Sequence, residues 1–115
     1  MATIKIAALT TNHAYRGRHF KTPALIAFQT EVSYLLPKMK VPAGKLKVKY
    51  EFGVSSKLAD YDNCVKAFQD CLSQKYGFND NRIYRAEITK KDVPSGKEYI
   101  KYQIETYREL TGQVA

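Results

Sequence analysis

Residues 45–54 read KLKVKYEFGV, and charged and apolar side chains alternate along them. This alternation, with a period of two residues, is typical of a β-strand that buries one face. The face expected to be buried consists of Leu46, Val48, Tyr50, Phe52 and Val54. The segment therefore predicts a strand whose apolar face packs against helices.

A helix and two further strands are expected after this strand. Cys64, Phe68, Cys71 and Leu72 fall within about 100° of one another on a helical projection, which predicts a helix from about residue 63 to 75 that ends near Gly77. Alternating residues predict strands over 82–89 and 97–107, and the turn sequence KDVPSG separates them.

The segment before residue 45 contributes one helix and one short strand. Thr22 and Pro23 are typical of a helix N-cap and first helical position, and Pro37 ends the apolar pattern after Leu36. A short strand is expected over residues 3–9, followed by an exposed loop. The order βαβαββ predicts one α+β domain over residues 1–115, with a mixed sheet of about four strands and two main helices.

Composition indicates an ordinary globular protein. The chain has 115 residues, of which 44% are hydrophobic, and no apolar run approaches the length of a membrane span. The first residues lack the apolar stretch of a signal peptide, so a cytoplasmic location is expected. Cys64 and Cys71 would lie about 10 Å apart along a helix at ~1.5 Å per residue, too far for a disulfide.

The positive charge is concentrated in the first half of the chain. Net charge is +8, and residues 1–59 hold ten lysines or arginines against two acids. Residues 60–115 hold nine of each. A basic surface beside a local group of acids suits a protein that binds phosphates and holds a metal ion against one of them.

Four of the five aspartates fall at positions 60, 62, 70 and 80. On a helix, Asp62, Lys66 and Asp70 follow one another at intervals of four residues, on the side opposite the apolar residues. Asp80 begins the next predicted strand and could approach Asp60 and Asp62 if that strand pairs beside the earlier one. Carboxylates without histidine or cysteine suit a hard ion such as Mg²⁺.

Structural explanations of these residues remain open. Asp62 could cap the helix, and Lys66 and Asp70 could form a surface pair. A calcium-binding EF-hand loop is excluded, because Val65 and Cys71 stand where that loop needs glycine and glutamate.

The longer pattern D60-Y-D62-N63-C-V-K66-A-F-Q-D70-C-L72, followed by G77-F-N-D80-N-R-I83, resembles the RusA family of Holliday-junction resolvases. The preceding RGRHFKTP, residues 16–23, also resembles the basic loop of that family. The resemblance implies a homodimeric, Mg²⁺-dependent DNA endonuclease of phage or prophage type that acts in DNA recombination and repair by paired nicks in four-way junctions. Mn²⁺ is expected to substitute for Mg²⁺.

By matching positions, the resemblance implies that Asp60, Asp62 and Asp80 bind the metal and that Lys66 is catalytic. Asn63 and Asp70 would have supporting roles. The family often has two adjacent acids where this chain has Asn79 and Asp80.

The basic loop is expected to contact branched DNA through Tyr15, Arg16, Arg18 and Lys21. Most other tyrosines occupy strand positions and are expected in the core or an interface. Two alternatives stay open: a non-catalytic nucleic-acid-binding protein, and a metal-dependent nuclease that acts on RNA or flap DNA. A basic loop can contact any phosphate backbone, so the sequence does not separate these substrates.

Overall fold

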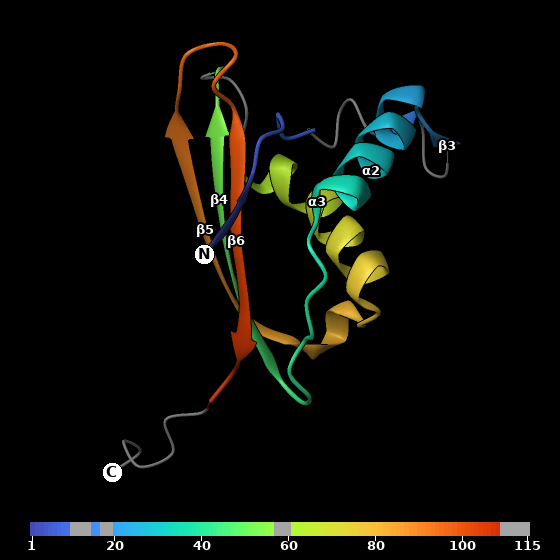
Figure 1. Cartoon of the computed structure of the whole chain (residues 1–115), viewed down its shortest axis with the longest axis vertical. Helices are drawn as coiled ribbons and strands as arrows, with labels where there is room; N and C mark the ends of the chain where they lie inside the picture. The colour runs from blue at the N-terminus through green and yellow to red at the C-terminus, as the bar shows by residue number, and fades with distance from the viewer. Residues whose placement is uncertain (10–14, 17–19, 57–60, 109–115) are drawn as a thin grey trace.

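Strand β4 (Leu46–Val54) lies in the interior of a four-stranded mixed sheet in this computed structural model. The order across the sheet is β1 (Ala2–Ile4), β6 (Tyr99–Thr106), β4 and β5 (Ile83–Asp92). Strand β6 pairs antiparallel with β1 and β4, whereas β5 pairs parallel with β4. Helices α2 (Pro23–Leu35) and α3 (Tyr61–Tyr76) cover one face of this sheet (Figure 1).

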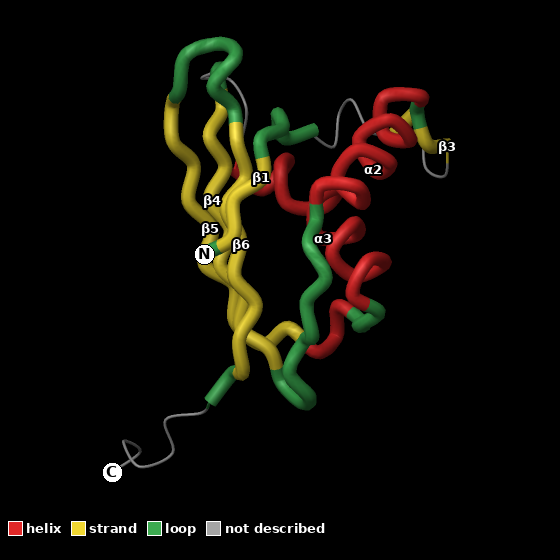
Figure 2. Tube along the Cα trace, in the orientation of Figure 1, coloured by secondary structure: helices red, strands yellow, loops and turns green. Residues whose placement is uncertain are grey.

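The structure describes residues 1–9, 15–16, 20–56 and 61–108, and for residues 15, 16, 20 and 61–63 it describes the backbone alone. The predicted α+β class is confirmed, with two layers formed by the sheet and the helices (Figure 2). None of the helices in these ranges is long and apolar enough to cross a membrane.

Three predicted elements differ in detail from the structure. The first strand covers Ala2–Ile4 instead of residues 3–9. The expected exposed loop contains two short strands, β2 (Tyr15–Arg16) and β3 (Phe20–Lys21), which pair antiparallel. Asp80 does not begin a strand but opens a short 3₁₀ helix, η1 (Asp80–Arg82), and β5 follows it.

Helix α2 begins and ends at the residues that the sequence indicates. The Thr22 side chain accepts a hydrogen bond from the Leu25 backbone N–H at 3.2 Å, and Pro23 occupies the first turn. Such a cap contributes about 1 kcal/mol to helix stability. Leu25, Phe28 and Val32 form the buried face of this helix.

The core lies between α3 and the apolar face of the sheet. The Phe68 ring makes edge contacts with Tyr50 and Tyr102, at ring-centre distances of 5.3 and 5.7 Å. Cys64 and Cys71 are buried as free thiols beside it, which confirms that they form no disulfide. Burial of each large apolar side chain contributes about 1.5–3 kcal/mol, so this contact surface fixes α3 on the sheet.

The opposite face of the sheet carries charged side chains. Lys47 Nζ lies 3.6 Å from Glu87 Oε2 and 3.7 Å from Glu105 Oε1. The Tyr99 hydroxyl donates to Glu51 at 2.7 Å, and this bond, together with nearby lysines, holds the pKa of Glu51 below its usual value. This alternation of buried and charged residues is the one predicted from residues 45–54.

Candidate metal and nucleic-acid site

Helix α3 carries the central part of the aspartate motif. Asp62 and Asn63 lie in its first turn, where the structure describes the backbone alone, and Asp60 lies outside the described residues. Lys66 follows one turn later and is exposed, and Asp70 follows after another turn and is half-buried. Because Cys64, Phe68, Cys71 and Leu72 are buried, the helix presents the row at positions 62, 66 and 70 on a different side from its core contacts.

Asp80 is held at the turn between α3 and β5. The Ser73 hydroxyl, from the last part of α3, donates to Asp80 Oδ1 at 2.6 Å. The Asn79 side chain caps η1 by accepting from the Asn81 backbone N–H at 2.9 Å. Asp80 is exposed, so its carboxylate is oriented by Ser73 and remains open to solvent.

Asp70 and Asp80 lie on one shallow depression of about 300 Å³, which Ser73 and Phe78 also line. The Tyr50 hydroxyl, on β4, donates to Gln69 Oε1 of α3 at 3.3 Å. Burial, and to a smaller extent the negative charge of Asp80, raises the pKa of Tyr50 well above its usual value. Tyr50 therefore stays a neutral hydrogen-bond donor there.

The structure separates Asp80 from Asp62 within one chain. The parallel register pairs Leu46 with Ile83 and Val54 with Asp92, so β4 and β5 begin at the same end of the sheet. Asp80 precedes β5, whereas the motif at positions 60 and 62 follows β4. Asp80 is hydrogen-bonded to Ser73, and from Asp62 to Ser73 the helix rises by about 16 Å at ~1.5 Å per residue. The predicted strand pairing is correct, but it leaves Asp80 far along α3 from the backbone of Asp62 in the same chain. Asp60 lies outside the described residues, so its expected approach to Asp80 stays a prediction.

The described side chains contain no group of three possible metal ligands. Within residues 1–9, 21–56 and 64–108, no three histidine, cysteine or acidic side chains are grouped closely enough to hold one metal ion, and the side chains at positions 60 and 62 lie outside these ranges. Asp70 and Asp80 are the pair that the described side chains bring to a common depression.

The residues predicted to bind DNA lie before α2. The backbones of Tyr15 and Arg16 form β2, Lys21 is exposed in β3, and Arg18 is outside the described residues. Burial raises the pKa of the Cys71 thiol to about 11; Asp70 adds to this rise and the positive charge of Lys21 opposes it. Lys21 therefore lies within electrostatic reach of Cys71 in the middle of α3.

Sequence reasoning missed a group of aromatic and basic residues at the start of β5. Lys45 Nζ lies 4.8 Å from the centre of the Tyr84 ring, and Tyr84 stacks against Tyr107. Arg82 and Arg108 flank these tyrosines in the sequence. The sequence signal for this group is the presence of basic residues next to tyrosines at 82–85 and 107–108. The strand positions of these tyrosines instead favour the core or an interface.

Compared with known protein families and with curated proteins, the chain matches none. The resemblance of residues 60–83 to the RusA family therefore remains a prediction from the motif itself.

Proposed function

We propose that the protein is a Mg²⁺-dependent, structure-selective DNA endonuclease that resolves four-way junctions by paired nicks. The observation that carries this proposal is the row at positions 62, 66 and 70 on the solvent side of α3, with its RusA-like spacing, while the other side of the helix is buried. A helix that only packed on the sheet would not require acids and a lysine in this register. The resemblance to the family supports roles in DNA recombination and repair, with the cytoplasm of a bacterial or phage-infected cell as the location.

The distance between Asp62 and Asp80 bears on how such a site would form. Asp80 is hydrogen-bonded to Ser73, which lies about three turns of α3 after Asp62, so its carboxylate and that of Asp62 in the same chain are too far apart to share one ion. In a two-fold dimer, however, Asp80 of one protomer can approach Asp60 and Asp62 of its partner, and symmetry then creates two identical sites. Dimerisation would thus complete the metal site and also supply one site for each strand to be cut.

The ligand types fit Mg²⁺, and Mn²⁺ would substitute, because both ions prefer carboxylate oxygens. A bound ion would supply the Lewis acidity that phosphodiester hydrolysis needs. Asp60, Asp62 and Asp80 would hold it, and Ser73 would keep the Asp80 carboxylate in position through its hydrogen bond. Asn63 and Asp70 would support the site from the same helix.

Lys66 would stabilise negative charge on the phosphate that is cut. It lies one turn from Asp62 and one turn from Asp70 on α3, and its side chain is exposed. A positioned ammonium group is worth most where charge increases in the transition state. Tyr15, Arg16, Arg18 and Lys21 would contact the DNA backbone beside the site.

A direct test incubates the protein with Mg²⁺ and labelled four-way junctions, linear duplex, flap DNA and RNA in parallel. The proposal predicts paired, symmetric nicks in the junction and little cutting of linear duplex. Preferential cutting of flaps or RNA would support the proposed metal site but contradict the proposed four-way junction substrate.

The main alternative is a nucleic-acid-binding protein without catalytic activity. The net charge of +8 would serve such a protein as well as it would serve a nuclease. Such a protein would bind junctions equally well with Mg²⁺ and with EDTA, and no substrate in the panel would be cut.

A further inference from the structure

Tyr84 is an exposed aromatic residue at an irregular position of the sheet. The register of β4 and β5 pairs Leu46 with Ile83 and then Lys47 with Arg85, so Tyr84 is the extra residue of a β-bulge. Bulges re-aim side chains and occur often beside active sites. The Tyr84 side chain is 57% exposed, although its ring is large and apolar.

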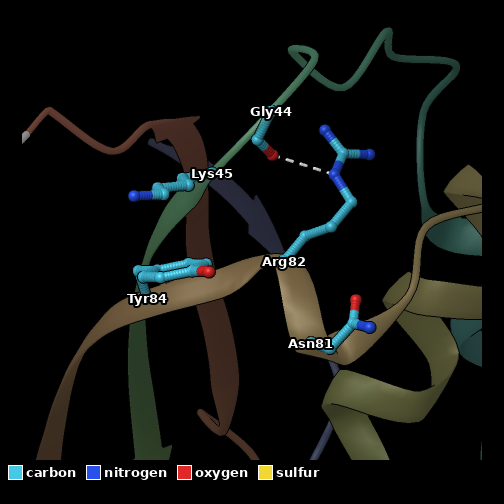
Figure 3. A pocket seen from close by; sticks show the side chains of 5 residues that line it. All are labelled: Gly44, Lys45, Asn81, Arg82 and Tyr84. Atoms are coloured by element: carbon cyan, nitrogen blue, oxygen red, sulfur yellow. Dashed lines mark hydrogen bonds between the residues drawn. The ribbon is translucent and has the colours of Figure 1, made fainter.

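Two neighbours fix the Tyr84 ring. Figure 3 shows Lys45 over this ring. Its Nζ lies 4.8 Å from the ring centre. The Tyr107 ring stacks with it at a centre distance of 5.8 Å and an angle of 22°. Because the Tyr107 backbone N–H also donates to the Lys45 carbonyl at 2.9 Å, all three residues are tied to the end of the sheet.

Arg82 is oriented at the border of the same surface. Its Nε donates to the Gly44 carbonyl at 2.9 Å, and its Nη2 donates to the Pro42 carbonyl. These contacts position the guanidinium group without neutralising its charge. Arg82, Lys45 and Tyr84 line an open hollow of about 380 Å³ together with Gly44 and Asn81 (Figure 3).

Tyr107 lines a separate hollow of about 380 Å³ together with Arg85 and Arg108. Glu105 also lines it, and Lys47 lies 3.7 Å from that carboxylate. Arg85 lies 3.6 Å from Glu87, which Lys47 and Lys49 also approach. Cations thus outnumber carboxylates among the described residues around the tyrosine pair, and the surface attracts a polyanion.

We propose that Tyr84 and Tyr107 form a platform on which an unpaired nucleotide of a DNA strand stacks, with Lys45, Arg82 and Arg108 contacting the adjacent phosphates. Aromatic side chains within a basic groove are the usual means of binding single strands, because every base has a π-face. In a duplex the base faces are covered by their neighbours, so the exposed Tyr84 ring and its partner Tyr107 add nothing there.

This inference rests on the proposed function only in taking DNA as the partner. Asn81 and Arg82 connect the platform directly to Asp80 along the chain, so a strand bound on it would lead to the candidate metal site. A four-way junction offers unpaired nucleotides at its crossover when it opens. The platform would therefore hold the opened strand beside the phosphate to be cut.

The test uses the absence of tryptophan from the chain. Tyr84→Trp places a single fluorescent indole on the platform, and Tyr34→Trp places one at a tyrosine of α2 that is 89% exposed. Oligothymidylate, added in EDTA so that no cutting occurs, is expected to quench the indole emission of the Tyr84→Trp protein. The emission of the Tyr34→Trp protein should stay nearly unchanged. Equal quenching in both proteins, or none in the Tyr84→Trp protein, would overturn the proposal.

Binding measurements with alanine variants complete the test. Tyr84→Ala is expected to weaken oligothymidylate binding roughly 5- to 150-fold, since stacking contributes ~1–3 kcal/mol per base, and Tyr84→Phe should retain it. Tyr34→Ala and binding to a closed duplex hairpin should change little. If quenching and weakened binding are seen but the protein cuts no junction, the platform is supported and the nuclease is refuted. If the protein cuts junctions but Tyr84→Ala binds oligothymidylate as the wild type does, the nuclease is supported and the platform is refuted.

Discussion

Asp80 is the proposed metal ligand whose side chain the structure describes. The Ser73 hydroxyl donates to one carboxylate oxygen at 2.6 Å and leaves the group exposed to solvent. The Asn79 cap fixes the backbone of the same turn. A ligand oriented in this way loses little conformational freedom on binding, which favours Asp80 as a metal ligand over a residue that only caps a helix.

The first prediction concerns the metal-binding acids. Asp62→Asn and Asp80→Asn should each abolish most Mg²⁺-dependent junction cleavage while junction binding remains equal or becomes tighter, because repulsion between carboxylate and phosphate falls. Cleavage assays and gel-shift titrations of the two variants measure both effects. If both variants cut junctions at the wild-type rate, the metal-ligand assignment would be wrong.

The second prediction concerns Lys66. Lys66→Ala should cut slowly but unfold at nearly the wild-type urea concentration, because an exposed helix pair contributes only about 0.3–0.5 kcal/mol. Lys66→Arg should restore little activity, since a planar guanidinium does not replace a compact ammonium group. A marked loss of stability with normal turnover would instead show that the lysine is structural.

The individual elements follow from local sequence patterns to different extents. The strand Leu46–Val54 and the start of α2 at Thr22–Pro23 were predictable because alternation and capping are properties of neighbouring residues. The short β2–β3 pair was not, since strands of two residues carry no periodicity. The first predicted strand was too long because Ile6, Ala8 and Leu9 pack on the core without joining the sheet.

The placement of Asp80 required more than local patterns. Strands joined through a helix run parallel, and this connection puts the start of β5 beside the start of β4. The order of strand, helix and strand in the sequence therefore predicts that the two strands start at the same end of the sheet. Pairing of these strands alone does not bring Asp80 close to the acids that follow β4 in the sequence. The platform at Tyr84 depends on a β-bulge, which no residue pattern in the sequence indicates.

A third prediction concerns the close contact of β4 with β6. A Cβ atom at Gly53 would overlap Cδ1 and Cε1 of the Tyr99 ring, which donates its hydroxyl to Glu51. Gly53→Ala should therefore destabilise the fold by about 1–3 kcal/mol in urea unfolding. In a Tyr99→Ala background the same change should cost much less, and an equal cost in both backgrounds would refute the contact.

A fourth prediction concerns the β2–β3 hairpin. Replacing Arg16, Arg18 and Lys21 with alanine should weaken binding to all DNA shapes and flatten the slope of log affinity against log salt by roughly 0.9 per lost phosphate contact. A matched variant with alanine at the exposed lysines 38, 40 and 97 removes the same charge elsewhere. Identical salt slopes in the two variants would show that the hairpin makes no particular contact with DNA.

At the scale of the whole molecule, one chain is an incomplete enzyme under this proposal. The structure holds Asp80 near one end of α3 and the backbone of Asp62 at the other. The proposed ligands Asp62 and Asp80 are therefore separated within one chain. A two-fold dimer supplies what each chain lacks and gives the two sites that paired nicks require, so the active species should sediment at twice the 13.1 kDa chain mass.

Complementation between two inactive variants tests this central claim most directly. Asp62→Asn and Asp80→Asn chains are mixed under conditions of subunit exchange and assayed on a labelled four-way junction with Mg²⁺. If each site takes Asp80 from the partner, every mixed dimer has one intact site, and random mixing should restore about a quarter of the wild-type sites, read as nicks in one strand. Asp60→Asn mixed with Asp62→Asn is the control and should stay inactive. The account would be contradicted if the wild-type protein cleaves the junction but the mixture of Asp62→Asn and Asp80→Asn chains is as inactive as the control.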